Sequence, residues 1–383
     1  DQVAVCHSGR LPIVSAWTPH FGEEPPIAGK NGSGNIFMGN CNLRCAYCNA
    51  GPKSPRAMPE AVGRKAVDRA LASLRDGGTL DLGFYGGEPL LEPIFVSGML
   101  DHAGRRARER GISLLATLTT NGTIAGPEAW KVLTRPDLDL AVSHDGLPDI
   151  HDRHRRTADG KASSEAVLGT MQRLREAGKE FRVVMVVRPD GVDALPDGIR
   201  FLRGRGVRRF EPSLDLHARW TPADRTRLEA AVERCAGLWL EDPRAFGIGW
   251  LEEKVSRLAR LPCPPSARCG FGDGEIAVAP SGRLYPCERL IGADDEANPM
   301  RLPGHALEGE DFPGMPAGGT REAPACLGCP VRSACDTACR CANFARTGEP
   351  GSPDALLCSF EKACIRAAAS ALGTARSEPA DVC

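Results

Sequence analysis

Short apolar runs, rich in β-branched residues, alternate with longer stretches of helical period from Asn35 to about residue 240. The runs expected to form strands are 35–39, 80–85, 112–118, 138–143, 181–187 and 208–214. The stretches expected to form helices lie near 60–76, 92–110, 127–134, 163–177 and 193–205. Hydrophobic strands that alternate strictly with helices are typical of a parallel sheet. Six such units are too few for a closed eight-unit barrel, so the sequence predicts an α/β fold with an incomplete, TIM-like (β/α)6 barrel.

The character of the sequence changes after residue 240, where Gly, Pro and Cys become frequent and helix-period runs become rare. A chain of 383 residues is also long for a single hydrophobic core. We therefore expect three parts. They are an N-terminal extension over 1–33, the barrel over 34–240, and a loop-rich, cysteine-rich domain over 241–383.

Three elements are expected in this C-terminal domain. Residues 275–286 contain two short apolar runs around Pro280-Ser-Gly282, which predicts a β-hairpin that leads straight into Cys287. A long loop is expected over 292–324. The helical period returns over 355–371, which predicts a closing helix.

The charged residues nearly cancel, since 48 Lys and Arg against 49 Asp and Glu leave a formal net charge of -1. This balance gives no global basic field, so bulk binding to nucleic acid is disfavoured. No run of eighteen apolar residues occurs, and the first residues do not have the pattern of a signal peptide. We therefore expect no membrane span and a cytoplasmic location. In that reducing compartment, cysteines persist as metal ligands or nucleophiles.

Three of the sixteen cysteines stand close together just after the first expected strand, as Cys41-x3-Cys45-x2-Cys48. Three thiolates can bind three irons of a [4Fe–4S] cluster and leave the fourth iron open. The alternative is a structural zinc site, which needs a fourth ligand such as His20. The three cysteines alone leave both metals open.

Polar turns that contain glycine follow the next three expected strands, at 86–89, 119–122 and 143–146. Each one alone is also a common turn sequence that requires no chemistry. Parallel α/β folds bind ligands at the carboxyl ends of their strands, and these ends meet at one edge of the sheet. The turns and the cysteine loop are therefore expected to form one site.

This ordered series resembles the radical S-adenosylmethionine (SAM) superfamily, whose signature C-x3-C-x-aromatic-C is matched up to Tyr47-Cys48. The likeness continues through Gly-Gly-Glu-Pro at 86–89, Thr-Asn-Gly at 120–122, Ser-His-Asp-Gly at 143–146 and the basic segment 151–155. It implies that the open iron chelates the amino and carboxylate groups of S-adenosylmethionine. The residues that it places around this cofactor are Tyr47 beside the adenine, Gly86, Gly87 and Glu88 at the amino group, Arg155 at the carboxylate, and Asn121 and Ser143.

Eight cysteines of the second half are enough for two sites of four thiolates each, and their spacing alone does not choose between iron and zinc. The series resembles the SPASM domain, a C-terminal extension of radical enzymes that holds two auxiliary [4Fe–4S] clusters. With the first cluster, this resemblance implies three clusters in all. The nearer auxiliary cluster would be held by Cys263, Cys269, Cys287 and Cys339, and the farther one by Cys326, Cys329, Cys335 and Cys358.

Two further residues near these ligands leave alternatives open. Cys341 follows Cys339 by two residues and could replace it as a ligand. Glu288 follows Cys287 directly, at a position where sulfatase-maturing members of the family carry an Asp that serves as a base. A Glu there can accept a proton as a catalytic residue, or it can be a solvated carboxylate in a turn.

The resemblance implies a 5′-deoxyadenosyl radical that takes a hydrogen atom from the substrate, with auxiliary clusters that accept the remaining electron. The net reaction would be an oxidation. We expect a peptide or protein side chain as substrate, in the maturation of a ribosomally made peptide such as cross-link formation. The enzymatic alternatives are oxidation of a Cys or Ser of a sulfatase to formylglycine and dehydrogenation of a small molecule. The alternatives without catalysis are an electron carrier and a zinc-stapled binding protein.

Two partners are expected beside the substrate. The first is an electron donor such as flavodoxin or ferredoxin, because the first cluster has to be reduced. Only about forty residues precede Cys41, too few for a typical precursor-binding domain. If a leader peptide is read, we therefore expect a separate protein to bind it.

Overall fold

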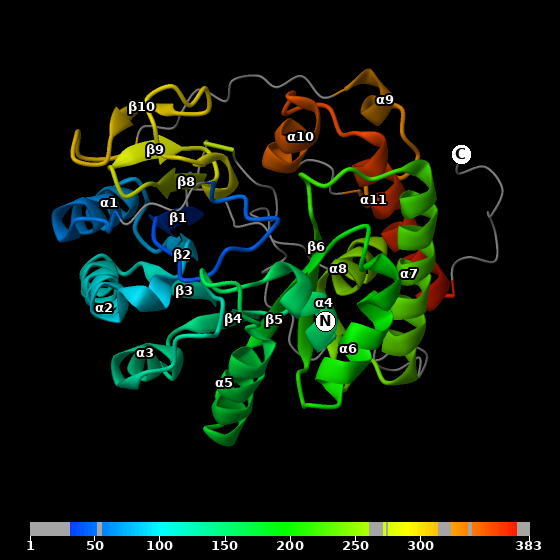
Figure 1. Ribbon diagram of the computed structural model, residues 1–383. Coiled ribbons are helices and arrows are strands. Elements are labelled where there is room, and N and C mark those ends of the chain that lie inside the picture. The colour runs from blue at the N-terminus through cyan, green and yellow to red at the C-terminus, as the bar shows by residue number, and fades with distance from the viewer. Residues whose placement is uncertain are drawn as a thin grey trace.

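The structure is a computed structural model that describes residues 31–51, 56–259, 271–272, 275–312, 323–335 and 339–373. Its centre is a ten-stranded sheet with the order β10-β9-β8-β1-β2-β3-β4-β5-β6-β7. Neighbouring strands run parallel from β8 through β1 to β7, and β8–β9 and β9–β10 pair antiparallel. Figure 1 shows that the sheet curves and that helices α1, α2, α3, α5 and α6 lie along its outer side.

The expected incomplete barrel is confirmed, and each of the six predicted strands is present. They are β1 (Asn31–Met38), β2 (Thr79–Gly86), β3 (Ser113–Thr120), β4 (Asp139–Ser143), β5 (Arg182–Val187) and β6 (Arg209–Leu214), followed by the short β7 (Gly247–Ile248). The five predicted helices correspond to α1 (Glu60–Ala72), α2 (Pro93–Glu109), α3 (Pro127–Leu133), α5 (Ser164–Glu176) and α6 (Leu195–Arg203). The structure adds α4 (Pro148–His154), α7 (Pro222–Glu241) and α8 (Gly249–Leu258).

Local sequence explains where these elements begin and what they bury. Helix α2 begins with a proline at its first position, and its residues Val96, Met99, Leu100 and Ala103 are buried in the main hydrophobic core. Burial of each large apolar side chain stabilises the fold by roughly 1.5–3 kcal/mol. Strand β4 is buried at four of its five residues, as expected for a strand covered on both faces.

The C-terminal segments contact both edges of the barrel. The predicted hairpin is formed by β8 (Glu275–Val278) and β9 (Arg283–Tyr285), and β8 pairs in parallel with β1. The predicted closing helix is α11 (Ala355–Ala371), which packs against α7 and α8. The segment also contains α9 (Pro324–Leu327) and α10 (Arg340–Thr347).

The prediction of a continuous loop over 292–324 is wrong at Leu302–His305. Residues Leu302–His305 form β10, because Leu302 and His305 pair with β9. A small hydrophobic cluster of Phe37, Ala50, Ala277 and Tyr285 joins the segment after β1 to this hairpin, and Cys48 packs against it. The cysteine loop is thus fixed against the C-terminal part of the chain.

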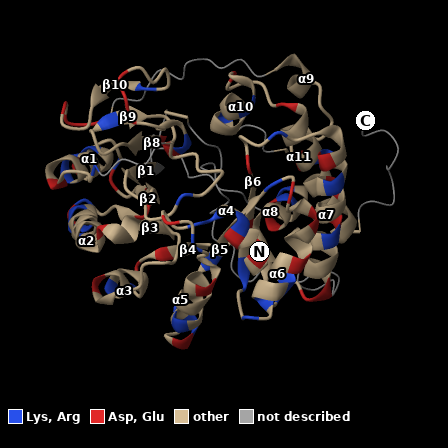
Figure 2. Cartoon of the chain, in the orientation of Figure 1, with Lys and Arg blue, Asp and Glu red and all other residues tan. Residues whose placement is uncertain are grey.

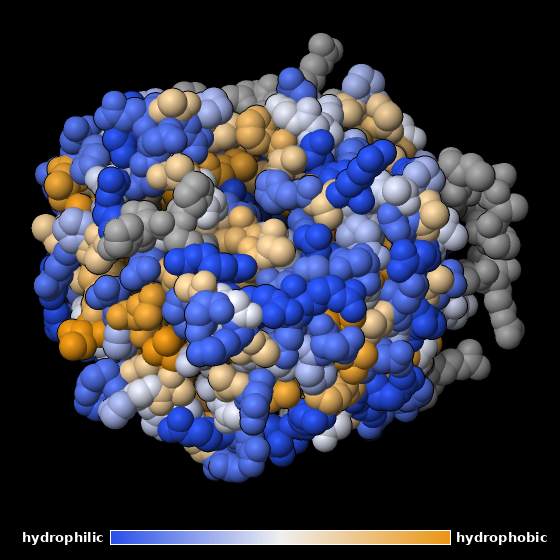
Figure 3. All heavy atoms as spheres, in the orientation of Figure 1, coloured by the Kyte–Doolittle hydropathy of each residue, from blue (hydrophilic) through white to orange (hydrophobic). Residues whose placement is uncertain are grey.

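The face in view is mixed in charge (Figure 2) and mostly hydrophilic (Figure 3). Figure 2 shows Lys and Arg interspersed with Asp and Glu along the helices, and Figure 3 shows apolar side chains only in separate patches on the face in view. Across the described residues, no helix has the length and apolar character that would let it cross a membrane.

Candidate active site

A cavity of about 450 Å³ lies at the carboxyl ends of the barrel strands. Cys41, Cys45 and Cys48 line it on the barrel side, and Cys287 and Glu288 line it on the C-terminal side. Of the other predicted site residues, the lining includes Tyr47, Gly86, Gly87, Asn121, Ser143, Arg155 and Cys339. The structure therefore brings the cysteine loop, the strand-end turns and two of the C-terminal cysteines, Cys287 and Cys339, to one cavity.

The cysteine loop is held in place by its backbone. Arg44 N donates to Arg156 O at 2.7 Å and Ala46 N donates to His154 O at 2.9 Å, so the loop lies along the segment after α4. Within the loop, Leu43 N donates to Cys41 Sγ at 3.4 Å. Burial raises the pKa of the Cys45 thiol, and the nearby Arg155 guanidinium opposes that rise. A cation beside these thiols favours the thiolates that metal binding requires.

The turn after β2 depends on its two glycines. A Cβ on Gly87 would lie 1.9 Å from Asn40 O, and Gly86 has a φ of +104°, which favours glycine. This close approach allows two backbone hydrogen bonds, from Gly87 N to Met38 O at 2.5 Å and from Glu88 N to Asn40 O at 2.7 Å. The turn after β2 is therefore fixed directly against the segment that leads into the cysteine loop.

Glu88 is directed into the protein. Its Oε1 accepts hydrogen bonds from Leu90 N at 2.9 Å and Thr120 Oγ1 at 2.8 Å, and its Oε2 accepts one from Asn121 N at 2.6 Å. Burial raises the pKa of Glu88 to about 7, although these three hydrogen bonds favour the carboxylate. Both carboxylate oxygens of Glu88 thus accept hydrogen bonds from other residues. Gly86 and Gly87, rather than Glu88, line the cavity at this point.

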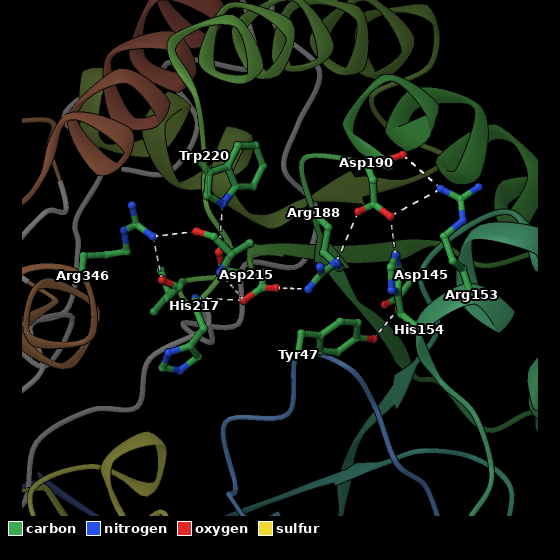
Figure 4. Close-up of polar contacts among 12 residues, drawn as sticks. Tyr47, Asp145, Arg153, His154, Arg188, Asp190, Asp215, His217, Trp220 and Arg346 are labelled. Atoms are coloured by element: carbon green, nitrogen blue, oxygen red, sulfur yellow. Dashed lines mark hydrogen bonds and ion pairs between the residues drawn. The ribbon is translucent and has the colours of Figure 1, made fainter. Parts of the chain in front are cut away.

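Asp145 makes several polar contacts beside the cysteine loop, and Figure 4 shows its contact with Tyr47. It accepts hydrogen bonds from Arg155 Nε at 3.0 Å, from Val186 N at 2.9 Å and from the Tyr47 hydroxyl. Burial lowers the pKa of Arg155, but Asp145, Tyr47 and Cys45 together outweigh this effect and raise the pKa. Burial also raises the pKa of Tyr47, whose ring centroid lies 5.2 Å from the Arg155 guanidinium carbon. Arg155 is therefore a fixed cation at the cavity.

A second group of polar contacts extends from this site toward the C-terminal helices (Figure 4). Arg188, after β5, pairs with Asp215, and Asp215 Oδ1 accepts a hydrogen bond from His217 N at 2.9 Å. Arg346, in α10, donates to Leu216 O at 2.8 Å. The loop after β6, which lines the cavity, is therefore held by the barrel on one side and by α10 on the other.

Three thiols come together on the C-terminal side of the cavity. Cys287 is 4% exposed, Cys341 is 2% exposed, and Cys287 Sγ donates a hydrogen bond to Glu288 Oε2 at 3.4 Å. Cys339 Sγ lies 3.4 Å from Cys341 Sγ. Glu288 is partly buried beside them, where its Oε2 accepts a hydrogen bond from Asn35 Nδ2 at 3.3 Å. Cys263 and Cys269 lie outside the described residues.

The second predicted set lies around the start of α11. Burial raises the pKa of the Cys358 thiol, and the nearby Cys326 raises it further. Cys329 contributes in the same direction. Cys335 is partly buried on the segment that follows α9. None of these four residues lines the cavity as described.

Sequence reasoning did not single out several residues that shape the site. Asp145 belongs to the turn at 143–146. An Asp-Gly pair directly after a buried strand is a signal for a residue that faces the site. Arg188 and Asp215 occupy the same position after β5 and β6, so their place at strand ends could have drawn attention to them. No periodicity indicates that Arg346 contacts the loop after β6.

Residues 35–208 match the model of the radical SAM superfamily. The cysteine-type anaerobic sulfatase-maturating enzyme of Clostridium novyi (strain NT) is 26% identical over 274 residues, which cover 66% of this chain and 71% of that enzyme. The PqqA peptide cyclase of Gluconobacter oxydans (strain 621H) is 25% identical over 270 residues, which cover 68% of this chain and 70% of the cyclase.

Solved structures share the fold. Native anSMEcpe with bound AdoMet superposes with a TM-score of 0.71 at 18% identity, and the match covers 90% of this chain and 100% of that chain. Streptococcus suis SuiB bound to precursor peptide SuiA superposes with a TM-score of 0.59 at 15% identity, over 85% of this chain and 75% of that chain. The matched family model and the thiol-lined cavity agree, and residues 35–208 form a radical SAM domain.

Proposed function

We propose that this enzyme oxidises a side chain of a peptide substrate in the cavity between the cysteine loop and Cys287-Glu288. When bound, a [4Fe–4S] cluster with S-adenosylmethionine supplies a 5′-deoxyadenosyl radical that removes a hydrogen atom from the substrate. The observation that carries the proposal is that thiols from both halves of the chain line one cavity. The donor set fits, because soft thiolates are the ligands that iron–sulfur clusters take.

The chain's own residues would bind and orient S-adenosylmethionine. In this proposal Cys41, Cys45 and Cys48 hold the first cluster, the backbone at Gly86 and Gly87 accepts the amino group, and Tyr47 lies beside the adenine. Arg155 would pair with the carboxylate, since it is a cation fixed by Asp145. Asn121 and Ser143 line the same wall. We assign Glu88 a positioning role, because its carboxylate is engaged by Leu90, Thr120 and Asn121.

On the C-terminal side, we assign two auxiliary clusters to the cysteines that resemble a SPASM domain. These clusters, three with the first, would take up the second electron of the oxidation. Glu288 is the residue we propose as the acceptor of the substrate proton, since it lines the cavity and burial raises its pKa. Its neighbour Asn35 donates to the carboxylate and fixes its direction.

The substrate we propose is a ribosomally made peptide that receives a cross-link. Support comes from the relatives, which include a PqqA peptide cyclase, and from the likeness of fold to SuiB bound to its precursor peptide SuiA. A flavodoxin or ferredoxin as electron donor and a separate leader-binding protein belong to the same proposal. The second candidate is formylglycine formation on a sulfatase, favoured by the similarity to sulfatase-maturating enzymes.

The test uses anaerobically reconstituted protein with S-adenosylmethionine and dithionite, with and without peptides. The peptides are those encoded beside the gene and a cysteine-containing sulfatase peptide. We expect 5′-deoxyadenosine by chromatography and the loss of two hydrogens from the neighbouring peptide by mass spectrometry. Cys45→Ala abolishes both signals, whereas Cys235→Ala, which changes a thiol buried in α7, leaves them intact.

Each outcome decides a different part of the proposal. No 5′-deoxyadenosine from the wild-type protein would refute the radical chemistry. 5′-Deoxyadenosine with an unchanged neighbouring peptide would refute the cross-linking assignment, and conversion of the sulfatase peptide alone would establish the second candidate.

A further inference from the structure

The cavity has one wall that the proposed function does not use. Strand β6 and helices α8 and α11 form it, and we call it the helix-side wall. Its residues are Glu211, Trp250, Glu253, Phe360 and Glu361. The ring centroids of Trp250 and Phe360 lie 6.1 Å apart, and the two ring planes meet at 69°. Carboxyl groups and aromatic rings thus occupy the same side of the cavity.

Two of the three carboxylates on the helix-side wall have a cation behind them. Glu253 Oε1 lies 2.6 Å from Arg257 Nε, one turn further along α8. Glu361 Oε2 lies 2.9 Å from Lys254 Nζ, whose side chain is only 1% exposed. The protein itself therefore balances the charges of Glu253 and Glu361.

Glu211, the third carboxyl group, differs from the other two. Within the part of the chain that the structure describes, it has neither a hydrogen bond nor an ion pair. The cations that influence its pKa are Arg182 and Arg209, and both of them pair with Asp139. Burial raises the pKa of Glu211 to about 8, and the two guanidinium groups oppose this rise only in part. Glu211 is thus a cavity carboxyl group without a counter-ion of its own.

The start of α8 leaves room for this carboxyl group. A Cβ on Gly249 would lie 2.0 Å from Glu211 Oε2, so a larger residue there would displace the carboxyl group. The next residue, Trp250, is 8% exposed, and its indole N–H has no hydrogen-bond partner among the described residues. Buried polar groups are normally hydrogen-bonded, so an unsatisfied donor at a cavity wall requires an explanation. A carboxyl group and an N–H donor on the helix-side wall thus both lack a partner.

A carboxylate on a wall that also carries aromatic rings favours a cationic ligand, since carboxylates form strong ion pairs and ring faces attract cations. A peptide supplies such a cation as the side chain of Lys or Arg, and its backbone carbonyls are acceptors for an indole N–H. We propose that Glu211 pairs with a basic side chain of the peptide substrate and thereby determines which peptides the cavity accepts. This inference rests on the proposed function and names the chemistry of one substrate residue.

The test measures binding rather than turnover. The anaerobically reconstituted protein with S-adenosylmethionine, but without a reductant, is titrated with three short peptides. They are acetyl-Gly-Lys-Gly-amide, acetyl-Gly-Arg-Gly-amide and the neutral acetyl-Gly-norleucine-Gly-amide, and saturation-transfer NMR gives each dissociation constant. We expect at least one basic peptide to bind at least about tenfold more tightly than the norleucine peptide. Equal or weaker binding of both basic peptides overturns the inference.

Two variants assign the preference to one residue. Glu211→Gln removes the charge and keeps the shape of the side chain. The matched control is Glu252→Gln, which changes a carboxyl group in the first turn of α8 that does not line the cavity. We expect Glu211→Gln to lose the preference for basic peptides and Glu252→Gln to keep it, and urea unfolding checks both folds. A preference that persists in folded Glu211→Gln overturns the inference. If Glu211→Gln does not fold, the comparison of peptides on the wild-type protein still decides.

Binding without a reductant separates this inference from the proposed function. If the wild-type protein forms 5′-deoxyadenosine with dithionite and modifies the neighbouring peptide, but binds basic and neutral peptides equally, only the role of Glu211 is wrong. If the preference for basic peptides depends on Glu211 while dithionite produces no 5′-deoxyadenosine, the radical chemistry fails and the binding role of Glu211 stands.

Discussion

Asp145 and Arg155 form an ion pair that is almost completely removed from solvent. Their side chains are 1% and 7% exposed, and Asp145 Oδ2 lies 3.0 Å from Arg155 Nε. The same carboxylate accepts hydrogen bonds from the Tyr47 hydroxyl and from Val186 N. One side chain after β4 thus connects the cysteine loop, the segment after α4 and strand β5.

This arrangement predicts that Asp145→Asn is strongly destabilising. The amide leaves the buried Arg155 charge without a counter-ion, and loss of one partner of a buried pair costs about 3–5 kcal/mol. We expect a lower midpoint of urea unfolding for Asp145→Asn. Asp159→Asn, which changes an exposed pair with Lys161, is the control and should leave the midpoint almost unchanged. Equal midpoints for the two variants would show that the Asp145 pair does not stabilise the fold.

Glu88→Gln is predicted to destabilise the site although it keeps the shape of the side chain. The glutamate accepts hydrogen bonds at both oxygens, from Leu90 N and Thr120 Oγ1 at one and from Asn121 N at the other. The NH2 group of glutamine is a donor and would face one of these N–H or O–H donors, so one hydrogen bond is lost. An unsatisfied buried polar group costs about 1–3 kcal/mol. Chemical unfolding measures the loss, with the exposed Glu180→Gln as control. A midpoint equal to that of the control would contradict the contacts described for Glu88.

The barrel could be predicted from the sequence because its signals are local. Strands β1 to β6 are apolar runs, and each is bounded by glycine or polar residues, so hydrophobic periodicity alone places them within a few residues. Helix α4 was missed because its seven residues are mostly polar and show no helical stripe. The start of α7 carries a capping box of Thr221 and Asp224 with Pro222 between them, a signal that could have been found.

The contacts that complete the site could not be predicted in the same way. Arg346 reaches Leu216 O over 130 positions of sequence, and only the packing of α10 against the loop after β6 brings them together. The direction of Glu88 is equally non-local, since it depends on donors from Thr120 at the end of β3 and from Asn121 in the turn that follows. Motifs thus indicate which turns meet, whereas the partners of each side chain follow from tertiary packing.

A stacked pair of buried histidines predicts that the fold loses stability on acidification. His144 and His151 have ring centroids 4.1 Å apart, and both are fully buried. Burial lowers the pKa of His144 to about 4, and the nearby Asp145 only partly opposes this effect. The unfolded chain binds this proton near pH 6.5. The free energy of unfolding should therefore fall as the pH decreases from about 6.5 to 4, by about 3 kcal/mol for His144.

Unfolding in urea at a series of pH values tests this histidine effect. His144→Asn keeps a hydrogen-bonding group at the position but cannot gain the proton, so its stability should depend less on pH over this range. His217→Asn is the control, because His217 is exposed. Parallel pH profiles for the wild-type protein and His144→Asn would contradict the prediction.

Gly87→Ala is predicted to disrupt the site through the backbone. The added Cβ would lie 1.9 Å from Asn40 O, so the turn after β2 has to move away from the segment before Cys41 and the hydrogen bond to Met38 O is lost. We expect a cost above about 3 kcal/mol, at the upper end for an overpacked position. Because the cysteine loop follows this segment, iron content after anaerobic reconstitution should fall as well.

Gly169→Ala is the matched control for the Gly87 variant. Gly169 is exposed in the interior of α5 with open space around the new Cβ, so alanine should stabilise the helix by up to about 1 kcal/mol. Unfolding midpoints and iron per chain are measured for both variants. If Gly87→Ala binds as much iron as Gly169→Ala and unfolds at the same midpoint, the close approach between the turn after β2 and Asn40 is not required to form the site.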